Sequence, residues 1–111
     1  MRRYGLTLNL KPDLVEVYKA HHRRVWPEVE AGLKRIGIVE MTIFLLGRRL
    51  FMHAVTEDGF NWDTDFGAYL EDPRCAAWQK LMDGFQEPVP EAGPGEWWAR
   101  MEEVYRLVQT G

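Results

Sequence analysis

The sequence contains no serine, a single cysteine and no long apolar run. Without serine, a serine nucleophile is excluded. The lone Cys75 rules out an intrachain disulfide and is typical of a reducing compartment. No stretch approaches the roughly 20 apolar residues of a membrane-spanning helix. Met1-Arg2-Arg3 leads into an alternating pattern and not into the apolar core of a signal peptide. We therefore expect a cytoplasmic protein with no membrane partner.

Positive charge and metal-ligand spacings are also scarce. The net charge of −3 and the pI near 5.6 give no basic face, so no nucleic-acid partner is expected. The three histidines, His21, His22 and His53, show no recognisable metal spacing. Cys75 has no evident base nearby and is interpreted as a buried small residue. No glycine-rich phosphate loop follows a predicted strand. We expect neither a metal nor a cofactor.

The chain contains enough apolar residues to form one hydrophobic core. Its 111 residues are 46% hydrophobic, and we interpret residues 1–111 as a single domain. Apolar periodicity predicts six elements. They are a strand at 3–10, a helix at 14–36 broken by Pro27 and ended by Gly37, strands at 38–46 and 50–56, a helix at 62–84 broken by Pro73, and a strand at 101–108.

This order predicts an α+β protein with the ferredoxin-like βαββαβ arrangement. In such a fold the helices cover one face of an antiparallel sheet, so the other face needs a cover. A second copy of the chain is the economical solution, and we expect a homodimer. Residues 86–95, rich in proline and glycine, form a loop long enough to be a lid or a subunit contact.

The segment 18–28 carries the strongest chemical pattern. Tyr18 and His22 lie four residues apart and share one helix face, whereas His21 points about 100° away. Pro27 breaks the helix after Val25-Trp26 and begins a second one. Such a break can hold an imidazole and a phenol at a cavity wall, where the imidazole serves acid–base chemistry, or it is an ordinary bend. His53 is assigned to a sheet face, with a place in the pocket left open.

Beyond the segment Tyr18-x-x-x-His22-x-x-Val25-Trp26-Pro27-Glu28, further tracts match the same pattern over nearly the whole chain. With them, the sequence resembles the L-rhamnose mutarotase family, which is similar to the dimeric α/β barrel proteins. These tracts are Leu33-Lys34 with Gly37, Ile43-Phe44-Leu45, Leu50-Phe51, Cys75-x-x-Trp78-x-x-x-Met82 and Glu103-Val104-Tyr105-x-Leu107.

The resemblance implies a cofactor-independent isomerase that interconverts the α and β anomers of a 6-deoxy-hexose such as L-rhamnose or L-fucose. It gives His22 the role of proton donor and Tyr18 a contact with the sugar. Trp78 would pack against the apolar face of the pyranose. A small-molecule sugar is therefore the expected partner.

Four departures from the family pattern bear on the substrate. Arg23-Arg24 follows His22 where the family usually has Asn-Pro. Met41 replaces a sugar-contacting tyrosine, Gln79 replaces the second of two tryptophans, and Phe66 replaces a further tryptophan. We assign substrate binding to Tyr18, Met41, Trp78 and Gln79, and expect a changed substrate more than a lost activity.

Two alternatives remain open from the residues. One is a non-catalytic or regulatory dimer that binds a small molecule on the same barrel. The other is a cofactor-independent oxygenase-like enzyme that acts on an aromatic or polyketide-like substrate. Several polar groups around His22 would favour a sugar, whereas a lone imidazole in an apolar cavity would favour the oxygenase.

Overall fold

β1 (Arg2–Leu10) is the central strand of the sheet in the computed structural model, which describes residues 1–109. It pairs antiparallel with β3 (Arg49–Thr56), which pairs antiparallel with β2 (Ile38–Leu46). Its other edge is shared by two short strands, β4 (Gln86–Glu87) and β5 (Ala99–Met101). The order β2-β3-β1-β4 confirms the ferredoxin-like prediction, with the last strand in two pieces.

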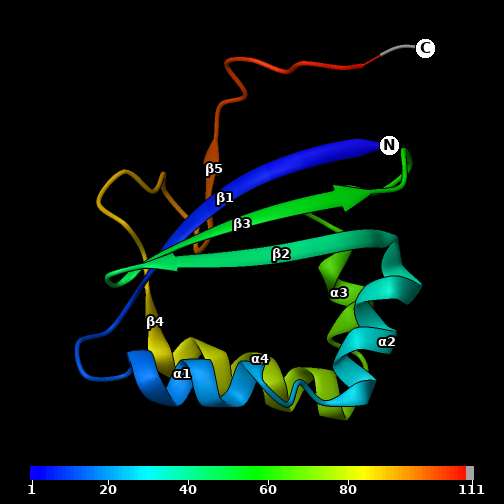
Figure 1. The fold of residues 1–111 in the computed structure, drawn as a ribbon. Coiled ribbons are helices and arrows are strands. Elements are labelled where there is room, and N and C mark those ends of the chain that lie inside the picture. Colours follow the sequence, from blue (N-terminus) through cyan, green and yellow to red (C-terminus); the bar gives the residue numbers. More distant parts are fainter. Residues whose placement is uncertain (110–111) are drawn as a thin grey trace.

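The sheet has two unlike faces, because the helices lie on one side of it (Figure 1). Leu6, Leu8 and Leu10 on β1 are 0% exposed and point toward the helices. The opposite face carries Gly5 on β1, Phe51 and His53 on β3, and Thr42 and Phe44 on β2. Within residues 1–109, no helix covers this face (Figure 1). We call this second surface the bare face.

The first helical segment is broken as predicted. α1 (Val15–His22) ends before a four-residue break, and α2 (Pro27–Ile36) begins with Pro27. Trp26 is extended, with φ −63° and ψ 135°, because a residue before proline avoids helical geometry. Gly37 ends α2 at φ +115°, a conformation that suits a residue without Cβ.

The second helical segment differs from prediction at its start. Pro73 does divide it, into α3 (Phe66–Tyr69) and α4 (Pro73–Phe85), and Asp72 caps α4. The expected helix from residue 62 is wrong. The Asn61 side chain accepts from the Asp63 N–H (2.9 Å), and Asp65 accepts from the Asn61 N–H (2.7 Å). These local bonds hold a turn in place of a helix.

The predicted strand at 101–108 is also wrong in its position. β5 ends at Met101, and residues 102–109 run away from the sheet without regular structure (Figure 1). Val104, Tyr105, Leu107 and Val108 are all exposed. Their apolar pattern is typical of a strand, but none of the strands in the described part of the chain pairs with this segment. The predicted loop at 86–95 in turn begins with the short β4.

Across residues 1–109, no helix is both long and apolar enough to cross a bilayer. Residues 110–111 of the predicted domain lie outside the described residues.

Candidate active site

A cavity of about 1130 Å³ lies between the covered face of the sheet and the helices. Every layer of the fold contributes to its walls, and all the sequence-predicted site residues line it. The predicted residues are His22, Tyr18, Met41, Trp78 and Gln79.

Tyr18 and His22 lie one helical turn apart on α1 and face this cavity. Their ring centroids are 4.1 Å apart at an interplanar angle of 30°. Nδ1 of His22 lies 3.0 Å from the Tyr18 carbonyl oxygen. Because a carbonyl only accepts, Nδ1 carries the hydrogen, and Nε2 of the neutral ring keeps its lone pair.

Burial sets the protonation states of this pair. Burial lowers the pKa of His22, and this is the largest effect on it. The hydrogen bond to the Tyr18 carbonyl raises this pKa, whereas the neighbouring His21 lowers it. Burial also raises the pKa of Tyr18 to about 12, although a side-chain hydrogen bond with Gln86 acts in the opposite direction. At neutral pH the cavity therefore holds a neutral imidazole and a neutral phenol.

Trp78 and Gln79 come from α4. Trp78 is only 6% exposed, since it packs edge-on against Trp26 at 5.0 Å and His22 at 5.5 Å between ring centroids. The Gln79 amide donates a hydrogen bond of 2.8 Å to Asp83. Trp78 lies beside His22 and Gln79 lines the same cavity, which makes this wall both aromatic and polar.

The opposite wall is formed by β2 and β3, and every side chain that these two strands contribute to it is apolar. Met41 lines it, as the assignment to substrate binding requires, but contributes no hydrogen-bond donor. Alternation on β2 and β3 brings its neighbours to the same surface. Together, this wall consists of Met41, Ile43, Leu45, Leu50 and Met52.

Several residues that line the cavity were not predicted from the sequence. Gln86 directly follows α4, and Trp97 donates a 2.9 Å hydrogen bond from Nε1 to its Oε1. Arg100 on β5 donates a 3.0 Å hydrogen bond to Asp63. The Trp97-Trp98 pair beside the glycine-rich loop was the one available indication. The loop itself reaches the cavity at Gly95.

The other reactive side chains lie outside the cavity lining. His21 packs against Phe85, at 5.3 Å between ring centroids, and His53 lies on the bare face, opposite Thr42. Cys75 is 0% exposed, its Sγ donates to the Glu28 carbonyl (3.3 Å), and burial raises the pKa of its thiol. The sheet-face interpretation of His53 and the buried interpretation of Cys75 are confirmed.

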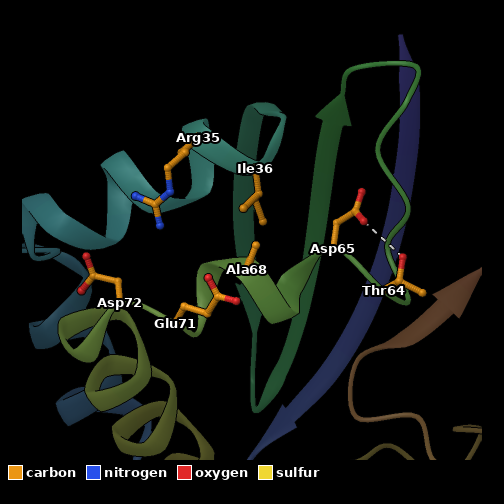
Figure 2. A pocket seen from close by; sticks show the side chains of 7 residues that line it. All are labelled: Arg35, Ile36, Thr64, Asp65, Ala68, Glu71 and Asp72. Carbon is orange, nitrogen blue, oxygen red and sulfur yellow. Dashed lines mark hydrogen bonds between the residues drawn. The ribbon is translucent and has the colours of Figure 1, made fainter.

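A second, shallower hollow of about 600 Å³ lies beside α2 and α3 (Figure 2). The Arg35 guanidinium extends toward the side where Asp72 and Glu71 lie, while Asp65 accepts a 3.2 Å hydrogen bond from Thr64. Within residues 1–109, no group of three histidine, cysteine or acidic side chains is positioned to hold a metal ion. This hollow contains neither Tyr18 nor His22.

The fold and the cavity define a ferredoxin-like α+β protein with an imidazole and a phenol that line one cavity. The sequence model of a family described as L-rhamnose mutarotase matches residues 3–107. The chain therefore belongs to the L-rhamnose mutarotase family.

Individual relatives support this membership. A Dictyostelium discoideum protein whose name states no activity is 42% identical, over 96% of this chain and 90% of its own. The L-fucose mutarotase of Xanthomonas campestris is 36% identical, over 99% of this chain and 91% of its own. The crystal structure of an L-rhamnose mutarotase from Formosa agariphila has the same fold, with a TM-score of 0.72 at 20% identity, over 97% of this chain and 100% of that one.

Proposed function

We propose that the protein is a mutarotase that interconverts the α and β anomers of a 6-deoxy-hexose of the L-rhamnose or L-fucose type. Family membership and the L-fucose mutarotase relative support an isomerase acting on such a sugar. The observation that carries the proposal is the pair on α1, a neutral imidazole with a free Nε2 beside a neutral phenol. Ring opening needs one group that takes a proton and one that gives a proton.

In this mechanism the neutral His22 is the base and Tyr18 is the acid. Nε2 of His22 takes the proton of the anomeric hydroxyl while the Tyr18 hydroxyl protonates the ring oxygen. The C1–O5 bond breaks, and the open aldehyde turns about its C1–C2 bond. As the C5 hydroxyl attacks C1 from the other face, it returns its proton to Tyr18. His22, now an imidazolium, donates its proton to the aldehyde oxygen, which becomes the new anomeric hydroxyl, so His22 acts as a proton donor in this second half of the reaction.

The two walls suit the two sides of a deoxy-sugar. Hydroxyl groups find partners in Tyr18 and Gln79 on the helix wall and in Gln86 directly after α4. The C5 methyl group and ring C–H bonds suit the apolar sheet wall at Met41 and Ile43. These convergent polar groups support a sugar over the aromatic substrate of an oxygenase-like enzyme, which a lone imidazole would favour.

The test is saturation-transfer NMR on the anomeric protons of L-rhamnose and L-fucose, with the wild-type protein and with His22→Ala. Faster exchange that disappears in the variant supports the proposal and ranks the two sugars. If a folded wild-type protein binds a sugar without faster exchange, the non-catalytic alternative replaces it. If it neither binds nor converts either sugar, these substrates are wrong.

We further propose that two copies of the chain pair through the bare face to form the dimeric α/β barrel. Phe44 is 58% exposed there, and Leu46 at the end of β2 is 85% exposed. Four exposed apolar residues follow in the segment 102–109: Val104, Tyr105, Leu107 and Val108. Large apolar patches of this kind are rare on monomers and mark contact surfaces.

A further inference from the structure

Trp97 and Gln86 are joined by a hydrogen bond in the cavity that also contains the Tyr18 phenol. All three residues line this cavity. We infer that Gln86 and Trp97 are positioning residues, which fix the Tyr18 hydroxyl as a hydrogen-bond donor toward the substrate. This inference rests on the proposed function, since it explains how the phenol is prepared to protonate the ring oxygen.

Trp97 determines which way the Gln86 amide is oriented. An indole nitrogen donates and never accepts, so the group 2.9 Å from Trp97 Nε1 is the Gln86 oxygen. Gln86 is 3% exposed, so water offers its amide little alternative. The reversed amide would place its NH₂ group against the indole N–H, with two donors facing each other. The amide is therefore held in one orientation.

The fixed amide then determines the direction of the bond to Tyr18. With its oxygen engaged by Trp97, Gln86 has its NH₂ group left for the phenol, and the amide lowers the pKa of Tyr18, as a donor to the phenol oxygen does. In this arrangement the Tyr18 oxygen is the acceptor. Its single hydrogen is consequently left for the cavity, which is the state that a proton donor to the ring oxygen needs.

The arrangement also gives a structural role to the segment that connects β4 to β5. Gln86 lies on β4, which pairs with the Leu10 end of β1, while Trp97 is two residues before β5. Both strands are held on one edge of β1. The chain between them thus returns to the cavity and brings the indole to the amide.

The sharpest test is Gln86→Glu, which keeps the shape of the side chain but replaces NH₂ with an acceptor oxygen. The carboxylate still accepts from Trp97, yet it now also accepts from the Tyr18 hydroxyl and removes its hydrogen from the substrate. We expect kcat to fall by about 10-fold or more, as for loss of a hydrogen bond to a developing charge, with KM changed by much less. Gln109→Glu, the same change on an exposed residue, is the matched control.

A double variant that combines Gln86→Glu with Tyr18→Phe distinguishes an effect that acts through the phenol from a general disturbance of the cavity. If Gln86 acts through the phenol, Gln86→Glu causes no further loss of kcat once the hydroxyl is gone. Losses that multiply in the double variant, or a wild-type kcat in Gln86→Glu, would overturn the inference. Trp97→Phe removes only the indole donor and is expected to lower kcat by a smaller factor, about threefold, because the amide then samples both orientations.

NMR provides a readout that does not depend on activity. The indole N–H resonance of Trp97 is expected to shift in Gln86→Met, and so is the Cζ resonance of Tyr18. Unchanged resonances in this variant contradict the hydrogen-bond chain, even where Gln86→Glu fails to fold. If the resonances shift but the wild-type protein converts no sugar, the chain of bonds stands and the proposed function fails.

Discussion

The two walls of the cavity differ completely in chemistry. The helix wall carries an imidazole, a phenol and the Gln79 amide, with the Gln86 amide directly after α4, whereas β2 and β3 contribute five apolar side chains. The difference follows from the folding pattern, since the sheet wall is the inner face of strands whose alternate residues form the core. In the proposed mechanism, proton transfer is therefore confined to the helix wall, and the sheet wall contributes shape. Changes to the first are expected to act on kcat, and changes to the second on KM and sugar choice.

The largest expected effect is the removal of the imidazole from the helix wall. His22→Ala takes away the base, and we expect anomer exchange to slow by about 10²–10⁴-fold, the usual size of general acid–base help. Exchange rates from saturation-transfer NMR measure it. His21→Ala is the matched control, since His21 is the adjacent histidine but lies outside the cavity lining. An equal loss of exchange rate in His22→Ala and His21→Ala would contradict the assignment of the base to His22.

Next in size is the response of the helix wall to pH. Burial lowers the pKa of His22 below its usual value near 6.5, so the folded protein favours the neutral ring. As the base, His22 is active above this lowered pKa, and exchange falls up to about tenfold per pH unit below it. A pH profile of kcat, corrected for the uncatalysed rate, measures this. Activity that rises toward acid pH would instead make the imidazolium the initial donor.

The same shift links His22 to stability. The unfolded chain binds this proton at the higher pKa, so it holds more protons than the folded chain between the two values. The stabilisation from neutral His22 is complete above the unfolded pKa and is lost as pH falls through the lowered one. Urea unfolding at several pH values measures the difference, and His22→Ala is expected to lack this contribution.

A smaller effect is expected when the sheet wall gains a polar group. Met41→Tyr restores the phenol that the family pattern has at this position. One additional hydrogen bond to the sugar is worth about 1 kcal/mol, so we expect KM for L-rhamnose to fall by roughly fivefold with little change in kcat. Met52→Leu, an apolar change on the same wall, is the control. A change in kcat larger than that in KM would show that this wall takes part in proton transfer.

The smallest effect on activity is expected on the bare face of the same sheet. Phe44 is exposed and stacks on Phe51 at 6.1 Å between centroids. A buried charge would oppose pairing through this face, so Phe44→Lys is expected to give a monomer by sedimentation or light scattering. Val17→Lys, on exposed α1, adds the same charge as a control. A dimer that persists in Phe44→Lys would show that the dimer interface lies outside the bare face.

Local patterns predicted most of the fold. The alternation of apolar and polar residues correctly predicted the three strands β1, β2 and β3. Pro27, Gly37 and Pro73 correctly marked helix boundaries, because the backbone restrictions of proline and the backbone freedom of glycine act within a few residues. The misplaced elements have a different cause. The turn at Asn61 depends on side-chain hydrogen bonds, and the segment 102–109 has an apolar pattern without a partner strand in this chain.

For the site, the sequence determined the pair on α1, because the four-residue spacing of Tyr18 and His22 on a helix places them on one face wherever that helix packs. Only the tertiary structure decided what surrounds this pair. Gln86 and Trp97 lie 11 residues apart, and they meet because β4 and β5 share one edge of β1. Burial, which lowers the pKa of His22 and raises that of Tyr18, likewise arises only when the sheet closes over the helices.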